Sequence, residues 1–341
     1  MKILIVKLSS LGDVIHAMPA LQDIRAAFPQ AQIDWVVERG FAPLVRRCTG
    51  VRRVIEVDLR RWRQALWSAQ TRAEWRAFKA QLQGEPYDAV LDLQGLTKSA
   101  FVSWLARLAP GGKRVAMANQ TEGSSYEAPT RWVAHQAIAL QRRSHAVQRS
   151  RALCAQALGY ALAPTLSYGL AGPAGTYHGI PVVPPTQRPC VALIHGSSRI
   201  DKQWPLTHWL ALGARLNEQG YTLVLPHGSE LEQREAEVLA AQLEHAIVWP
   251  RLELDVMIDA LNTCVGVIGV DSGLSHLAVA LDLLHVQIYN FDTAWRTGPQ
   301  QAAHQISVYA RPCPSVDAVW QSWLAATGVD QPAPQPPPGS H

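Results

Sequence analysis

The sequence predicts an α/β protein with two doubly wound, parallel-sheet domains. Apolar, β-branched runs alternate with helix-length amphipathic segments through both halves of the 341-residue chain, a rhythm typical of parallel sheets covered by helices. A Gly- and Pro-rich stretch at 169–189 interrupts that rhythm, as connections between domains do. The length also suits two domains better than one. We therefore expect two Rossmann-like units that face a central cleft.

The first half supplies the elements of the first sheet. Strands are expected at residues 2–7, 33–37, 54–57 and 89–92, with a weaker one at 114–116, and helices at 62–83 and 145–158. Apolar residues from Ala17 to Phe28 recur on one helical face, but Pro19 interrupts them. Either the regular helix begins near Met18, or it kinks there.

The second half repeats the alternation. Strands are expected at 190–194, 222–225, 247–249, 265–270 and 286–289, and helices at 206–219, 230–243, 254–262 and 272–281. The proline-rich end predicts a disordered tail. The predicted division is a first domain at 1–170, a linker at 171–189, a second domain at 190–314, a helix at 315–328 and the tail at 329–341.

Composition limits the class of protein. An apolar share of 48% and a charged share of 17% are typical of a soluble globular protein. No run approaches the ~20 apolar residues of a membrane span, and the polar residues from Ser9 onward exclude a signal peptide. The five cysteines are scattered, without a C-x-x-C pair. These features predict a cytoplasmic protein with neither a disulfide framework nor a zinc site.

Positive charge is concentrated in two stretches. Arginines crowd residues 46–63 and again 142–151, although the net charge is only +4. The clusters indicate either a solvated face or an anionic partner such as a phosphate, a charged sugar or a membrane surface. Nucleic acid is not expected, because no nucleic-acid module accompanies the charge. Trp62, Trp67 and Trp75 lie among the arginines and could be core residues or contacts to lipid headgroups.

The first strand ends in a polar loop. Residues 7–13 read Lys-Leu-Ser-Ser-Leu-Gly-Asp, which brings Ser10 and Asp13 to the carboxyl end of the strand, where ligands bind in open α/β sheets. Asp13 has two interpretations. It either caps the following helix or acts on a ligand as a catalytic carboxylate.

Three strand ends in the second half have similar polar loops. Ser197, Ser198 and Lys202 follow the first of these strands, and together could hold phosphate oxygens. Glu230 follows the second strand and either binds ribose hydroxyls or interacts with the helix dipole. The third strand ends in Asp271-Ser-Gly, and the next helix presents its N-terminal amides and His276 to an anion such as a diphosphate. Lys202 could equally be solvated, and His276 a core residue.

Several motifs are missing. The sequence contains no H-E-x-x-H, EF-hand loop or Asp-x-Asp, so it predicts no carboxylate-held metal. It has no G-x-S-x-G, and residues 266–273 depart from G-x-G-x-x-G, so a nicotinamide cofactor is not expected either.

Together these segments resemble the lipopolysaccharide heptosyltransferases, and type I rather than type II. The resemblance is carried by Lys7-Leu-Ser-Ser-Leu-Gly-Asp-Val-Ile-His-Ala-Met-Pro-Ala20, Asp92-Leu-Gln-Gly-Leu-Thr-Lys98-Ser, His145-Ala-Val-Gln-Arg-Ser-Arg151, His195 to Pro205, and Gly269-Val-Asp-Ser-Gly-Leu-Ser-His276. It implies a GT-B fold with the acceptor on the first domain, the sugar nucleotide on the second, and the helix 315–328 packed back on the first. It also implies inverting transfer of L-glycero-D-manno-heptose from ADP-heptose to the first Kdo of Kdo2-lipid A, at the cytoplasmic face of the inner membrane.

The resemblance also assigns roles to residues. Asp13 would be the general base, and Lys202 with Ser197 and Ser198 would hold the diphosphate with no metal. Further donor contacts would come from Glu230 at the ribose, Met257 at the adenine, Asp271 at the heptose, and Ser272, Gly273 and His276 at the phosphates. Acceptor contacts would come from Ser10, Arg60, Lys98 and Arg142.

Two departures from the family pattern limit these assignments. Ser197-Ser198 stands where threonine is expected, and residues 115–135 do not align with the family's acceptor loop. The alternatives are a heptosyltransferase that uses a later core acceptor or another nucleotide sugar, and a non-catalytic sugar-nucleotide-binding protein.

Overall fold

The computed structural model describes residues 1–170, 188–300 and 302–328. The chain divides into two compact units. Of the described residues, the first unit contains 1–170 together with the short segments 252–262 and 295–297, and the second contains the others. Residues 171–187 of the predicted linker and all of the predicted tail, 329–341, lie outside the described residues.

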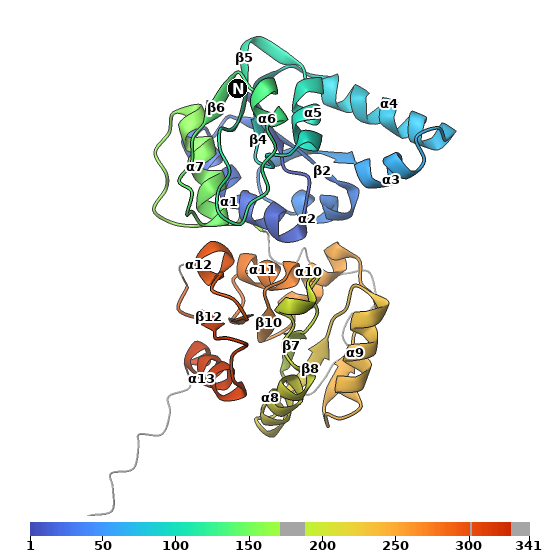
Figure 1. Ribbon diagram of the computed structural model, residues 1–341, viewed down its shortest axis with the longest axis vertical. Helices are drawn as coiled ribbons and strands as arrows, with labels where there is room; N and C mark the ends of the chain where they lie inside the picture. Colours follow the sequence, from blue (N-terminus) through green and yellow to red (C-terminus); the bar gives the residue numbers. More distant parts are fainter. Residues whose placement is uncertain (171–187, 301, 329–341) are drawn as a thin grey trace, which may run out of the picture. The chain divides into compact units, whose positions relative to one another are not determined.

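The first unit is built on a six-stranded parallel sheet (Figure 1). Its strands are β1 (Lys2–Val6), β2 (Gln32–Glu38), β3 (Val51–Val57), β4 (Tyr87–Asp92), β5 (Leu108–Met117) and β6 (Gln136–Ile138), in the order β3-β2-β1-β4-β5-β6. In the central pairing Val6 lies opposite Asp92, so β1 and β4 end side by side. Strand β1 is buried from Ile3 to Val6, as its apolar run predicts for a central parallel strand.

Helices α1 (Leu11–Ala27), α2 (Ala42–Arg46), α3 (Leu59–Gln64), α4 (Ala69–Gln83), α5 (Thr97–Leu105), α6 (Pro129–Val133) and α7 (Ala146–Leu158) belong to the first unit. Helix α1 runs unbroken past Pro19, so the predicted start near Met18 is wrong. The expected helix 62–83 is two helices, because the Ser68 hydroxyl accepts a hydrogen bond from Thr71 N and starts a new helix there.

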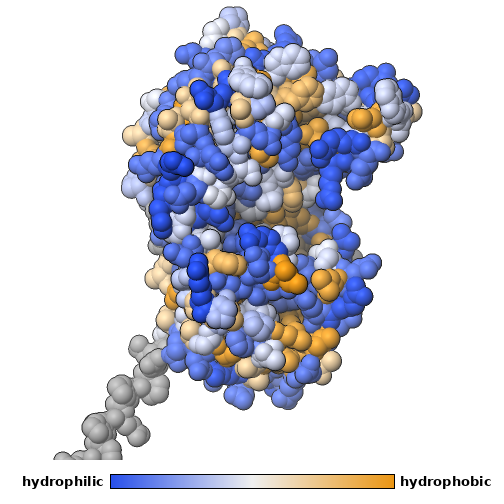
Figure 2. All heavy atoms as spheres, viewed as in Figure 1, coloured by the Kyte–Doolittle hydropathy of each residue, from blue (hydrophilic) through white to orange (hydrophobic). Residues whose placement is uncertain are grey.

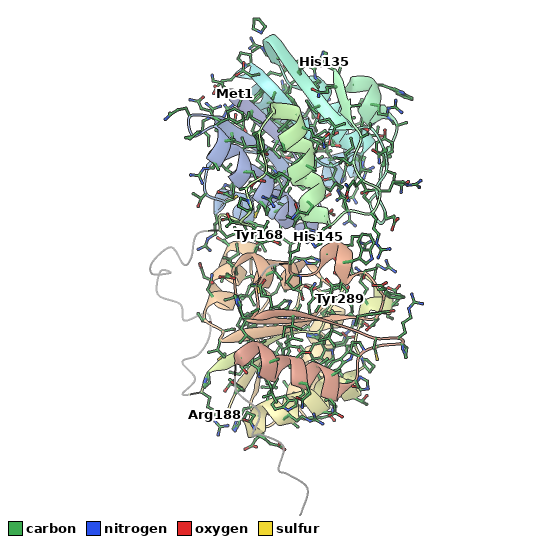
Figure 3. All side chains as sticks on the ribbon, turned by 90° about the vertical axis from the view of Figure 1, so that its left-hand side faces the viewer. Met1, His135, His145, Tyr168, Arg188 and Tyr289 are labelled. Atoms are coloured by element: carbon green, nitrogen blue, oxygen red, sulfur yellow. The ribbon has the colours of Figure 1, made fainter. Side chains whose placement is uncertain are left out.

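The second unit repeats this sheet. Strands β7 (Cys190–Ile194), β8 (Thr222–Leu225), β9 (Ala246–Val248), β10 (Gly266–Val270), β11 (His285–Tyr289) and β12 (Gln305–Tyr309) are parallel neighbours in the order β12-β11-β10-β7-β8-β9. Tyr289 marks the end of β11 in Figure 3. Counted from its own first strand, each sheet has the order 3-2-1-4-5-6, the Rossmann order. The predicted α/β fold with two such sheets is therefore confirmed.

The second unit contains helices α8 (Leu206–Glu218), α9 (Glu230–Ala240), α11 (Gly273–Ala280) and α13 (Val316–Thr327). Helix α10 (Leu254–Asn262) and all but the first residue of α12 (Ala294–Thr297) group with the first unit. The sequence placed the helix 315–328 on the first domain. Instead, Val319, Trp323 and Ala326 of α13 lie in the core of the second unit with strand residues such as Ile288. Their spacing puts all three on one helical face, and the second sheet covers that face.

The two sheets each have one switch point, where successive connections leave in opposite directions. It lies between β1 and β4 in the first sheet and between β7 and β10 in the second. Ligands of open α/β sheets bind outside the carboxyl ends of the strands at such points. The loops after these four strands are also the ones in which the sequence placed most of its candidate residues.

Candidate active site

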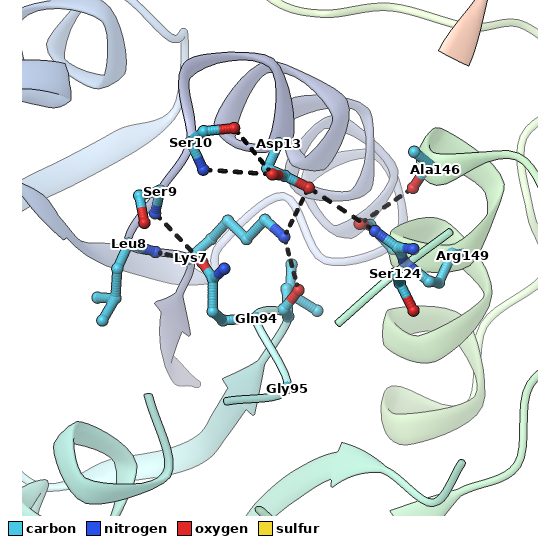
Figure 4. Close-up of polar contacts among 12 residues, drawn as sticks. Lys7, Leu8, Ser9, Ser10, Asp13, Gln94, Gly95, Ser124, Ala146 and Arg149 are labelled. Carbon is cyan, nitrogen blue, oxygen red and sulfur yellow. Dashed lines mark hydrogen bonds and ion pairs between the residues drawn. The ribbon is translucent and has the colours of Figure 1, made fainter. Parts of the chain in front are cut away.

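In the first unit, Asp13 occupies the first turn of α1, directly beyond β1 (Figure 4). The backbone N and the hydroxyl of Ser10 both donate to Asp13 Oδ2, at 3.2 and 3.0 Å. Ser10 is the N-cap of α1 and Asp13 is its third residue, so Asp13 completes a capping box and is not itself the N-cap that one of our two interpretations made it. Asp13 Oδ1 faces elsewhere, toward Lys7 Nζ at 3.5 Å and Arg149 at 3.9 Å.

Positive charge determines the protonation of Asp13. Burial by itself would raise the pKa of the carboxyl group, but Lys7, His16 and Arg149 outweigh that effect and hold it well below its usual range. The carboxylate is nonetheless accessible, because 40% of its side chain is exposed whereas Lys7 is buried. Asp13 is therefore ionised at neutral pH and open to a ligand.

Residues after β4 hold the loop that carries Asp13. Gln94 Oε1 accepts hydrogen bonds from Leu8 N and Ser9 N at 3.1 and 3.2 Å. The predicted acceptor residue Lys98 donates to Ser9 Oγ at 2.8 Å. The structure thus brings Ser10 and Lys98 to the same loop as Asp13.

The turn after β4 is itself fixed by a buried carboxylate. Asp92 accepts hydrogen bonds from the backbone N of Gln94 and Gly95 and from Ser99 Oγ, at 2.9 to 3.1 Å. Burial raises the pKa of Asp92 to about 6, against the effect of these hydrogen bonds. Asp92 therefore orients Gln94, which in turn holds the Asp13 loop.

In the second unit, Asp271 follows β10 and joins two of the predicted donor residues. Its Oδ2 accepts from Lys202 Nζ at 2.6 Å, and its Oδ1 lies 3.2 Å from His276 Nε2. Gln287 Nε2 lies 3.5 Å from the other ring nitrogen of His276, which favours a proton on Nε2. Burial would raise the pKa of Asp271, but His276 and Lys202 hold it well below its usual range.

The start of α11 lies beside this cluster. Ser272 is the N-cap residue, and its buried hydroxyl has no hydrogen-bond partner within the described ranges. Gly269 lets β10 approach β7, because a Cβ there would lie 2.7 Å from that of Ile194. The free amides of the first turn of α11 and the Ser272 hydroxyl are the kind of donors that bind an anion at a helix N-terminus.

Two glutamates lie in the first turn of α9, beyond β8: the predicted Glu230 and also Glu232. Glu230 is exposed at the first position of α9, whereas Glu232 Oε2 accepts from Gly228 N at 2.7 Å. A Cβ at Gly196, after β7, would lie 2.5 Å from the Glu232 carboxyl group. Glu232, not Glu230, therefore reaches the loops after both β7 and β8.

The remaining predicted residues are placed as follows. Ser197 Oγ lies 3.5 Å from the carbonyl oxygen of Asp271, and Ser198 is exposed beside it. Arg60 on α3 and Arg142 before α7 are exposed, and Met257 is buried on α10. No contact recorded for the described residues links these last three to either carboxylate.

Four residues of the loops described here were not predicted: Lys7, Gln94, Arg149 and Glu232. Three of them lie in quoted motifs, since Lys7 begins the first motif, Gln94 lies inside the segment 92–99 and Arg149 inside the segment 145–151. Among the described residues, no group of three or more His, Cys, Asp or Glu could hold a metal ion. In the same residues we find no helix both long and apolar enough to cross a membrane.

Comparison with known proteins decides the family. The model of glycosyltransferase family 9 (heptosyltransferase) matches residues 75–318. The chain belongs to this heptosyltransferase family. This chain is accordingly a glycosyltransferase.

Curated family members cover most of the chain. Lipopolysaccharide heptosyltransferase 1 of Pseudomonas aeruginosa is 40% identical over 297 residues, which are 85% of this chain and 78% of that protein. The protein of the same name from Escherichia coli K12 is 39% identical over 290 residues, 85% of this chain and 88% of its own. The predicted resemblance to type I heptosyltransferases is confirmed.

Solved structures of the family agree. E. coli heptosyltransferase WaaC with ADP superposes with a TM-score of 0.81 at 33% identity, and covers 94% of this chain and 98% of its own. WaaC with ADP-2-deoxy-2-fluoro heptose gives a TM-score of 0.74 at 34% identity, with 96% and 98% covered. The family's fold therefore extends over both units.

Proposed function

We propose that this chain transfers L-glycero-D-manno-heptose from ADP-heptose to the first Kdo of Kdo2-lipid A, with inversion at the anomeric carbon. The heptosyltransferase 1 relatives at 39–40% identity support the reaction. The donor is supported by the solved relatives that hold ADP and an ADP-heptose analogue. The single observation that carries the mechanism is the ionised, accessible Asp13 beyond β1.

In the proposed reaction an acceptor hydroxyl attacks the anomeric carbon of the donor. The new C–O bond forms as the bond to the diphosphate oxygen breaks, and the hydroxyl proton passes to Asp13. Oδ2 is already engaged by Ser10, so Oδ1 is the oxygen that accepts the proton. Lys7 and Arg149 make Asp13 a weak base, so the transfer occurs as bond formation acidifies the hydroxyl.

The leaving ADP takes up negative charge, and we propose that Lys202 stabilises it. Lys202 is more accessible than Asp271, at 20% against 5% side-chain exposure, so its ammonium can reach a ligand while Asp271 holds its position. Ser197, Ser198, Ser272 and Gly273 would supply hydroxyl and amide donors to the phosphates. This charge stabilisation would proceed with no metal.

Other contacts follow from position. We propose that Glu232 takes the ribose contact first assigned to Glu230, that Asp271 and His276 meet the heptose and phosphate, and that Met257 lies near the adenine. Ser10, Arg60, Lys98 and Arg142 would bind the anionic groups of the acceptor. Because Kdo2-lipid A carries acyl chains, the enzyme would work in the cytoplasm, peripherally associated with the inner membrane.

The test is ADP release with ADP-heptose and delipidated Kdo2-lipid A, for the wild type and for Asp13→Asn. We expect acceptor-dependent release that collapses in the variant and is unaffected by EDTA. Release that survives the substitution would remove Asp13 as the base. Turnover only with a heptosylated core would assign a later step, and donor binding without transfer to any acceptor would indicate a binding protein.

A further inference from the structure

The exposed aromatic residues of the first unit are concentrated on consecutive helices. Trp67 is 87% exposed in the α3–α4 turn, Trp104 is 59% exposed on α5, and Trp132 is 80% exposed on α6. Elsewhere in the described residues the tryptophans are buried or half-buried. Large exposed aromatic side chains that gather in one region mark interaction surfaces more often than chance exposure does.

Stacked aromatic rings support the exposed tryptophan of α5 from the core. Trp62 is the buried residue of α3 and meets Trp75 edge-on at 5.8 Å. Trp75 stacks on Phe101 at 5.9 Å, and Phe101 stacks on Trp104 at 6.2 Å. A continuous row of rings therefore runs from the core to the surface of α5. Its outer end is supported from beneath and so holds a fixed position.

Leu66 and Trp67 are adjacent exposed apolar residues. Both are exposed in the turn that ends α3 and precedes the Ser68 cap of α4. Figure 2 shows hydrophobic residues set among hydrophilic ones over α3 and α4, at one end of the first unit. We call Leu66, Trp67 and the exposed arginines around them the α3–α4 tip.

The charge of the α3–α4 tip is strongly positive. Residues 59–83 contain five arginines and one lysine but only one acidic residue, Glu74. Glu74 is already occupied, since Arg61 and Trp62 Nε1 both donate to it. Arg60, Arg63 and Arg72 remain exposed. Their guanidinium groups are open to anions from outside the chain.

We infer that the α3–α4 tip docks on an anionic lipid bilayer. Tryptophan prefers the interface between headgroups and acyl chains, Leu66 would enter the apolar edge, and the arginines would bind lipid phosphates. A soluble anion would use the arginines but leave Leu66 and Trp67 exposed. A second copy of the chain would bring two positive tips together, which charge repulsion opposes.

The α3–α4 tip would be the surface through which the proposed enzyme contacts its membrane. The inference rests on the proposed function only for the identity of that membrane. Vesicle binding needs neither donor nor acceptor. A failure of the docking surface can therefore be told from a failure of the proposed reaction.

The test is sedimentation of the full chain with vesicles of phosphatidylcholine, with or without phosphatidylglycerol. We expect binding to the anionic vesicles that weakens as salt is added. The double variant Leu66→Ser, Trp67→Ser should bind roughly tenfold more weakly, because it loses much of the buried apolar area. Arg63→Gln should weaken binding about fivefold.

The matched control is Tyr309→Ser, which removes an exposed aromatic side chain from the second unit and should leave vesicle binding unchanged. Turnover of the double variant with the delipidated acceptor should stay within about twofold of wild type, since surface substitutions rarely disturb the fold. Absence of wild-type binding to anionic vesicles would overturn the inference. Equal binding by the double variant would do the same, because Leu66 and Trp67 would then make no contact with the bilayer.

Discussion

The two switch points carry the same pair of groups with opposite accessibility. Each has an aspartate after a central strand and a lysine within reach, Lys7 with Asp13 and Lys202 with Asp271. In the first unit the lysine is buried and the carboxylate is 40% exposed. In the second unit the carboxylate is 5% exposed and the lysine is the more open partner.

This difference separates the roles of two similar pairs. An open carboxylate beside a buried cation remains ionised before the ligand binds, and it can then accept a proton from that ligand. An open cation with a buried carboxylate can bind a phosphate, because the buried partner fixes the position of the ammonium group. Two copies of one sheet topology thus present a base on one unit and an anion site on the other.

The largest expected effect comes from Asp13→Asn. The amide keeps the shape and can still accept from Ser10, but it cannot take the proton, so kcat should fall on the order of 10³-fold. Donor affinity, measured by calorimetry with ADP, should not change. A kcat within tenfold of wild type would contradict the assignment of the base to the first unit.

Next in size is Lys202→Met, which removes the ammonium from the second pair while preserving the length of the side chain. We expect kcat to fall roughly 10²-fold, because charge on the leaving ADP is no longer stabilised. It also leaves Asp271 buried without one of its cations, so thermal unfolding should be followed in parallel. If Lys202→Met and Lys7→Met lowered kcat equally, the difference in exposure between the two lysines would not correspond to a difference in their roles.

Much of both sites follows from local sequence. The strand ends, the polar loop that leads to Asp13 and the Asp271-Ser-Gly turn are recognisable because apolar runs stop at polar, glycine-containing loops. These features depend on neighbours in the chain, and the sheet topology then brings them together. The fold class could be predicted for the same reason.

The partners of each carboxylate could not be predicted in this way. Arg149 reaches Asp13 from α7, and Gln94 holds the Asp13 loop from beyond β4, so both depend on long-range packing. Lys7 directly follows β1, whose residues Ile3–Val6 are all buried and apolar, so its position in the sequence does not mark it as a partner of Asp13. Glu230 and Glu232 differ by two helical positions, about 200° around the axis, so a correct helix start was still not enough to choose between them.

A smaller effect distinguishes those two glutamates. Glu232→Gln keeps an acceptor for Gly228 N but loses the charge that would bind ribose hydroxyls, so the KM for ADP-heptose should rise about tenfold. Glu230→Gln should raise it by less than about twofold, as expected for an exposed charge at a helix start. The reverse ranking would restore the sequence assignment to Glu230.

The smallest effect is a shift in pH dependence. Lys7 helps to hold the pKa of Asp13 below its usual range, whereas burial acts to raise it. In Lys7→Met one of the positive charges that lower this pKa is lost while His16 and Arg149 remain, so the pKa of Asp13 should rise toward its ordinary value of about 3.9. Wild-type kcat/KM should persist as the pH falls toward 4, whereas the variant should begin to lose activity at a higher pH than the wild type. An acid limb at the same pH in both proteins would show that the buried lysine of the first pair has no influence on the base, and the two pairs would then differ in position alone.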